Sequence, residues 1–128
     1  MSVVLFPITE ITVPKSVTKL TIDDDSSASL TLLAGATGKR IYVLGLHLFV
    51  NGATDLKLKS FNGVSTYTNI DGSMGFAAAG NVVIDRPAMG DPVRDRCFPI
   101  AMTNVGEALV LTNSASVRLG GSVFVVQQ

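Results

Sequence analysis

The side chains that could do chemistry in this sequence are few, and they are not grouped. His47 is the only histidine and lies in an apolar stretch, while Cys97 is the only cysteine. A zinc site needs several nitrogen or sulfur ligands, and nucleophilic catalysis needs a base beside the nucleophile. Because neither residue has such a partner close by in the sequence, a packed or interface role is the favoured interpretation of His47. We therefore expect a protein that is not an enzyme and has no cofactor and no metal.

One acidic run, Asp23 to Ser27, is a candidate for binding a cation. Calcium prefers clustered oxygen ligands, but this run lacks the alternating spacing and the terminal glutamate of an EF-hand loop. A solvated turn between two strands is the favoured interpretation. The sequence leaves open whether the run binds a cation.

The composition favours surface buried between subunits. Apolar residues make up 47% of the chain and charged residues only 16%, and the mean hydropathy is +0.43. These values are high for a soluble monomer, and no run of about 18 apolar residues points to a membrane span. Obligate interfaces resemble a protein core cut in half. We therefore expect the chain to associate with itself or with a larger assembly.

The charge balance argues against binding to nucleic acid, and the cysteine content and the N-terminal residues argue against secretion. Ten basic residues match ten acidic ones, so the chain has no excess positive charge to neutralise phosphates. Tryptophan is absent, so few aromatic side chains are available to stack on bases. A single cysteine excludes an internal disulfide and favours a reducing compartment. The apolar run Val3 to Phe6 is followed by Pro7 and has no basic region before it, unlike a signal peptide. We expect no binding to nucleic acid or membrane.

Apolar periodicity predicts strands through nearly all of the chain. Most segments alternate apolar and polar residues, whereas Ile41 to Val50 is apolar on both faces, which predicts a central strand buried on both sides. Turn pairs such as Asn51-Gly52 separate the segments. The pattern predicts an all-β protein, an antiparallel β-sandwich that is jelly-roll-like. The expected strands cover residues 17–22, 28–33, 41–50, 54–60, 65–68, 81–84, 108–113 and 117–127.

Two segments are predicted to contact a partner. An extended N-terminal arm, residues 1–14, precedes a single β-sandwich domain, residues 15–128. The stretch from Asp85 to Pro99 combines arginines, apolar anchors and prolines without a strand pattern, which suits a contact surface. A plain solvated loop is the alternative for that stretch. The candidate partner-binding residues are Val3, Val4, Leu5, Phe6, Ile8, Arg86, Met89, Arg94, Arg96 and Phe98.

Three stretches resemble small virion proteins of tailed bacteriophages. Residues 32–45 read Leu-x-Ala-Gly-Ala-x-Gly-Lys-x-Ile-x-Val-x-Gly, residues 106–112 read Gly-Glu-Ala-Leu-Val-Leu-Thr, and residues 120–125 read Gly-Gly-x-Val-x-Val. The resemblance extends over about residues 27–128. Such proteins are compact β-sandwiches, some of them capsid decoration (cement) proteins and others minor tail or baseplate components. The resemblance brings no catalytic residue with it.

The resemblance implies a bacteriophage structural protein, made in the bacterial host cytoplasm and carried on the capsid surface of the virion. As a cement protein it would bind the major capsid protein as a homotrimer, and binding only the expanded shell would stabilise that shell by mass action. The alternatives are a tail-tip or baseplate component and a host-receptor-binding module of the virion. A small β-sandwich enzyme is disfavoured because no acid and base are paired.

Overall fold

The computed structural model describes residues 3, 8–25, 28–85 and 96–128. Within these ranges every regular element is a strand, and no helix is present that could cross a membrane. The strands are β1 (Ile11–Thr12), β2 (Thr18–Asp24), β3 (Ser29–Leu33), β4 (Ile41–Val50), β5 (Thr54–Phe61), β6 (Tyr67–Asn69), β7 (Met74–Phe76), β8 (Gly80–Asp85), β9 (Arg96–Cys97), β10 (Ala101–Met102), β11 (Ala108–Asn113) and β12 (Leu119–Gln127).

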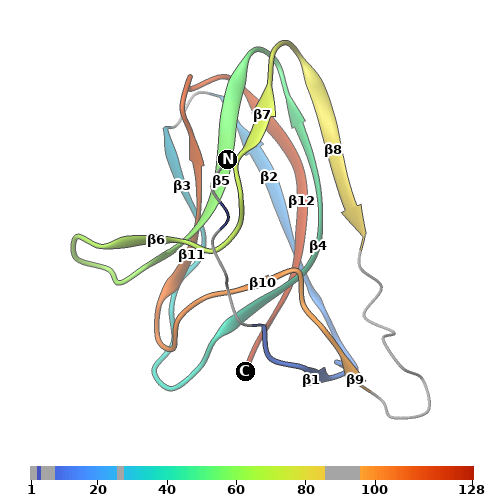
Figure 1. The fold of residues 1–128 in the computed structure, drawn as a ribbon, viewed down its shortest axis with the longest axis vertical. Helices are drawn as coiled ribbons and strands as arrows, with labels where there is room; N and C mark the ends of the chain where they lie inside the picture. The colour runs from blue at the N-terminus through green and yellow to red at the C-terminus, as the bar shows by residue number, and fades with distance from the viewer. Residues whose placement is uncertain (1–2, 4–7, 26–27, 86–95) are drawn as a thin grey trace.

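Two antiparallel sheets face each other (Figure 1). The β4 sheet has the order β10-β4-β12-β2, and β8 also pairs with β4. The β11 sheet has the order β3-β11-β5-β6, and β7 also pairs with β5. A separate two-stranded ladder joins β1 to β9. The predicted antiparallel β-sandwich is confirmed, and the jelly-roll connectivity stays a prediction.

The core lies between the two sheets and is built from alternate residues of their long strands. Leu46 and Leu48 of β4, Leu58 of β5 and Leu111 of β11 are each at most 1% exposed. Side chains two residues apart on a strand point to the same face, so each long strand contributes a row to this core. Full burial of one such side chain contributes about 2 kcal/mol.

The long strands lie close to their predicted positions. The bounds of β4 and β11 agree with the prediction, and the other predicted strands shift by a few residues at their ends. The alternation predicted for β5 is confirmed, since Leu56 and Leu58 are buried while Lys57 and Lys59 face outward. The short strands β1, β7, β9 and β10 were not predicted as strands. Two or three residues are too few to show a period of two.

The prediction that β4 is buried on both sides is correct for only part of the strand. Its inner side is covered along the whole length, and on its outer side Leu44 is 4% exposed beneath β1 and β9. Further along that outer side His47 is only partly buried and Phe49 is 43% exposed. Among the described residues, the β1–β9 ladder covers one end of this face and nothing covers the other.

The prediction of an irregular segment from Asp85 to Pro99 is wrong at both of its ends. Strand β8 continues through Asp85, and Arg96 and Cys97 form β9. Pro99 is buried. Residues 86–95, with the candidates Arg86, Met89 and Arg94, lie outside the described residues.

The first two of the three motif stretches meet in the structure through their backbones. The Gly106 amide donates a hydrogen bond to the Lys39 carbonyl over 2.7 Å. A Cβ atom on Gly35 would overlap the carbonyl oxygen of Gly106, and Gly106 itself has a φ of 81°. Only glycine fits such a close approach without strain. These motif glycines therefore serve the packing of two connections that are distant in the sequence.

Candidate contact surfaces

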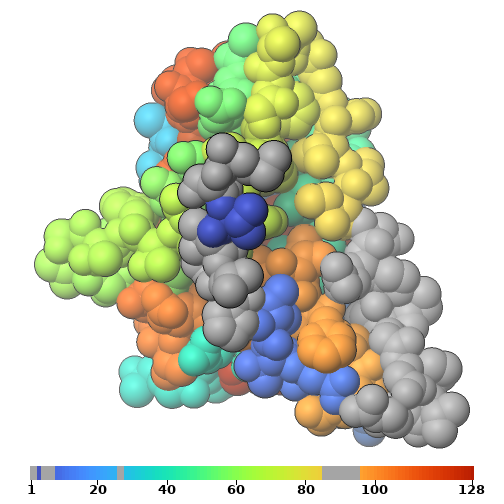
Figure 2. All heavy atoms as spheres, viewed as in Figure 1, coloured from blue at the N-terminus to red at the C-terminus, as the bar shows by residue number. Residues whose placement is uncertain are grey.

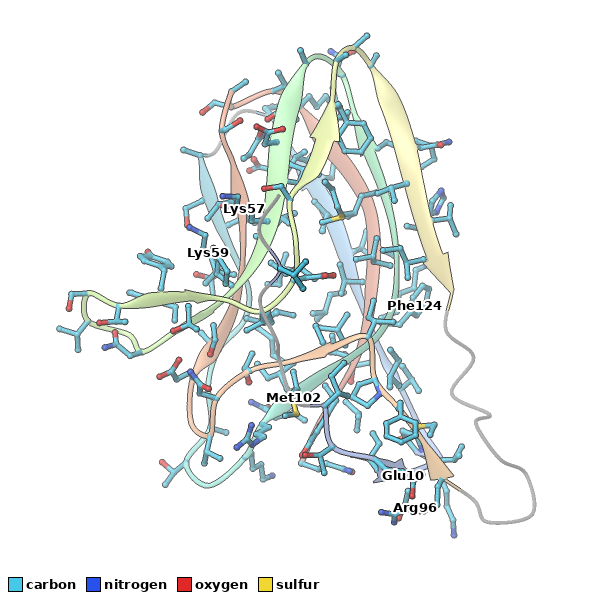
Figure 3. The ribbon with its side chains drawn as sticks, in the orientation of Figure 1. Glu10, Lys57, Lys59, Arg96, Met102 and Phe124 are labelled. Atoms are coloured by element: carbon cyan, nitrogen blue, oxygen red, sulfur yellow. The ribbon has the colours of Figure 1, made fainter. Side chains whose placement is uncertain are left out.

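The most distinctive surface lies on the outer side of the β4 sheet. Strand register places Val83 of β8 beside His47 of β4, and it places Phe124 of β12 opposite Gly45. Exposure reaches 43% for Phe49, 61% for Val83 and 37% for Phe124. We call the four residues His47, Phe49, Val83 and Phe124 the outer apolar face; Phe124 is labelled in Figure 3.

This outer apolar face is shaped as well as apolar. The His47 and Phe49 rings meet edge to face, with their centroids 4.5 Å apart. A hollow of about 370 Å³ is lined by Gly45, Leu46, His47, Val83, Ile84 and Phe124. Its wall groups are apolar apart from the imidazole and the backbone. Covering such a surface with another apolar surface is favourable by about 25 cal/mol for each Å² removed from water.

The edge strand β8 borders the outer apolar face, at one margin of the molecule (Figure 2). Of the described strands, only β4 pairs with β8. Residues 80–84 read Gly-Asn-Val-Val-Ile and carry no charge. Edge strands are normally protected by charged residues, as in β2 at the opposite edge, which contains Lys19, Asp23 and Asp24. Asp85, at the end of β8, is the one charged residue of the strand. Residues 80–84 therefore form a weakly protected edge among the described residues, which suits the addition of another strand.

The outer side of the β11 sheet is different in character. Lys57 and Lys59 project from β5 there and are labelled in Figure 3. The Phe61 and Tyr67 rings stack with their centroids 4.1 Å apart, and the Lys59 ammonium lies 5.9 Å from the Tyr67 ring. The charged side chains make this a solvated face. The outer side of the β4 sheet carries charge as well, at its β2 edge, where Lys19 lies beside Phe124 in the register, but its β8 half is apolar among the described residues.

A second contact region lies where the N-terminal segment meets β9. The Arg96 guanidinium donates from Nε to Glu10 Oε1 over 3.1 Å, and from its two terminal nitrogens to the Thr12 hydroxyl over 2.9 Å and to the Glu10 carbonyl over 3.2 Å. Beneath this contact Ile11, Leu44 and Cys97 form a small buried cluster. Figure 3 shows Glu10 and Arg96 close together at this end of the molecule.

The structure places four of the ten predicted contact residues. Val3 is 76% exposed, Ile8 is 40% exposed, and Phe98 next to β9 is 49% exposed. Ile8 also lines a groove of about 340 Å³ together with Arg40, Thr68, Ile70 and Met102. Arg96 holds Glu10 in place. The remaining six, Val4, Leu5, Phe6, Arg86, Met89 and Arg94, lie outside the described residues.

Phe49, Val83 and Phe124 were not predicted from the sequence as surface residues. Each of them sits in a strand beside buried residues, so only its position within the period of two separates it from the core. The sequence feature that could have indicated an exposed apolar surface is the run of apolar residues on both faces of β4. The sequence could not show that half of the outer side would stay uncovered.

The acidic run departs from the prediction of a turn. Asp23 and Asp24 belong to β2, and only Asp25 follows the strand within the described part of the run. The Arg118 guanidinium lies 3.2 Å from an oxygen of Asp23 and 3.7 Å from one of Asp25. Within the described ranges, no group of three histidine, cysteine, aspartate or glutamate residues is placed to hold a metal ion.

No protein-family model and no curated protein matches this chain. Among solved structures, the chain is similar to a chain of the extra small virus virus-like particle of the giant freshwater prawn Macrobrachium rosenbergii, at 14% identity and a TM-score of 0.31. That match covers 98% of this chain and 83% of the other. A likeness at this TM-score is too weak to assign a function.

Proposed function

We propose that this chain is a virion structural protein, and specifically a capsid decoration protein of a tailed bacteriophage. The observation that supports a structural role is the outer apolar face beside the edge strand β8, whose residues 80–84 carry no charge. A soluble monomer rarely keeps such a surface open, and contiguous apolar patches mark protein contact sites. The motifs at residues 32–45, 106–112 and 120–125 support the choice of virus class.

A second copy of this chain is the proposed occupant of the outer apolar face. The chain has no net charge and a high apolar fraction, so copies do not repel one another and gain from burying surface. A homotrimer is the arrangement we propose, by analogy with other cement proteins. Each copy would then bury its Val83 and Phe124 against a neighbour.

The contact with the shell is proposed to use the N-terminal arm and the segment around residues 86–95. An extended apolar arm such as Val3 to Phe6 can add to a neighbouring sheet edge through main-chain hydrogen bonds. Arginine suits ion pairs at interfaces better than lysine does, which favours Arg86 and Arg94 as contacts for acidic capsid loops. Because Arg96 already binds Glu10 and Thr12 in this structure, it is less suited to that task.

The role of the outer apolar face is tested by placing a charge on it. Val83→Glu puts a carboxylate among apolar side chains and should convert the trimer to monomer, because an interface would have to bury an unpaired charge. Sedimentation velocity measures the change, with the wild type at three times the 13.4 kDa chain mass. The same variant should bind expanded heads more weakly in co-sedimentation, since it loses the multivalency of the trimer.

The matched control is Val64→Glu, which adds the same charge at a valine that is 84% exposed on the other side of the sandwich. This control should remain trimeric and bind heads like the wild type. A wild-type protein that stays monomeric at micromolar concentration would contradict the proposed interface. Equal behaviour of the two variants would do the same.

A further inference from the structure

Residues 10–12 of the described N-terminal segment are held to the domain by a short strand ladder and by the Arg96 side chain. The β1–β9 ladder contains two residue pairs, Ile11 with Cys97 and Thr12 with Arg96. Around it, the Arg96 guanidinium makes three hydrogen bonds to other described residues, two of them to Glu10 and one to Thr12. With so short a ladder, these side-chain hydrogen bonds add to the attachment that the ladder and the burial of Ile11 provide.

The segment covers a cluster that is separate from the main core. Ile11 is 5% exposed and packs with Leu44 and Cys97, and the partly buried Val13, Tyr42 and Val126 surround them. The residues of this cluster do not belong to the core between the sheets. Local opening of a terminal segment needs less free energy than global unfolding when the main core stays intact. The segment can therefore detach while the sandwich remains folded.

We infer that Arg96 is the positioning residue of a latch, which holds residues 10–12 on the outer side of β4 and so fixes where the preceding arm begins. When the latch is closed, Ile11 covers Cys97. When it opens, the Cys97 thiol and the apolar surface of Leu44 are uncovered. The use of this latch in presenting the arm to a capsid rests on the proposed function, but the latch itself does not.

The thiol of Cys97 supplies a direct readout, because it is the only thiol in the chain and is 1% exposed. A maleimide should label the folded wild-type protein slowly, because it reacts only with the small fraction of molecules in which the latch is open. Arg96→Ala should label faster by about tenfold or more, because it removes three hydrogen bonds from a charged group. Glu10→Gln should label at an intermediate rate, since it weakens the contact from the other partner and leaves residue 96 unchanged.

The matched control is Arg118→Ala. Arg118 is also an ion-paired arginine, but its partners are Asp23 and Asp25. This variant should label at the wild-type rate. The inference is overturned if Arg96→Ala labels as slowly as the wild type, or if Arg118→Ala labels as fast as Arg96→Ala. Far-ultraviolet circular dichroism and the melting temperature show whether faster labelling occurs in a folded protein.

Two further variants keep the test decisive if Arg96→Ala does not fold. Arg96→Lys retains the charge but loses the fork of donors, so it should label faster than the wild type. Ile11→Cys places a second thiol directly opposite Cys97 in the ladder. Mild oxidation should give an intrachain disulfide and a monomeric band on a non-reducing gel. Interchain bands would overturn a latch closed within one chain.

These outcomes are independent of capsid binding. A confirmed latch in a protein that does not bind expanded heads would refute the proposed function alone. Uniform labelling across all the variants in a protein that does bind heads would refute the latch alone.

Discussion

Two glycines of this chain show how backbone packing can fix the identity of a single residue. Gly121 has a φ of 124°, and a Cβ atom there would overlap the carbonyl oxygen of His47 on the neighbouring strand. The Gly-Gly pair at residues 120–121 can be recognised in the sequence. The need for glycine at position 121 cannot, because it comes from a contact between β12 and β4. Similarly, Gly35 needs its small size because of Gly106, about seventy residues later.

The packing role of Gly121 gives a sharp prediction. Gly121→Ala should lower the free energy of unfolding by about 2–4 kcal/mol, from strain at positive φ and the overlap with β4. The control is Gly72→Ala, where the structure leaves open space for a Cβ atom and φ is not positive. That variant should stay within about 0.5 kcal/mol of the wild type. Urea unfolding measures both, and similar losses in the two variants would contradict the proposed close contact.

Among the elements, the long strands were predictable and the short ones were not. The ten residues of β4 and the eight of β5 show their periods in the sequence, whereas β1 and β9 exist only because each pairs with the other. The sequence also could not show which outer surface would be covered. The β1–β9 ladder covers one end of the outer side of β4. This ladder joins residues that are more than eighty positions apart in the sequence.

The two sides of β4 predict opposite results for neighbouring residues. Leu48 is fully buried in the core and Phe49 is 43% exposed on the outer side. In dilute protein, Leu48→Ala should cost about 2–5 kcal/mol of unfolding free energy, as large-to-small core changes do. Phe49→Ala should cost about 1 kcal/mol or less, because much of its ring already meets water.

Self-association provides the complementary measurement for this pair. Phe49→Ala should weaken the oligomer in sedimentation experiments more than Leu48→Ala does, provided that Leu48→Ala is studied at a temperature where it is folded. The opposite order would show that the outer apolar face is not the interface between copies.

At the scale of the whole molecule, the outer side of the β4 sheet carries an apolar area over β8, β4 and β12, while Lys19 and Asp23 of β2 add charge at the opposite edge of that side. The β11 sheet presents Lys57 and Lys59, while the β4 sheet presents Phe49, Val83 and Phe124. The all-β fold and the expectation of association follow from composition and periodicity. The location of the contact surface required the register between β8, β4 and β12, which sequence alone does not provide.

The position of the protein in a purified virion tests the central claim most directly. Virions can be labelled with gold-conjugated antibody against this chain and imaged by electron microscopy. The account predicts many labels distributed over the outer surface of the capsid, because a decoration protein occupies repeated positions on the shell. Labels confined to the tail tip or baseplate, or virions without label, would contradict it.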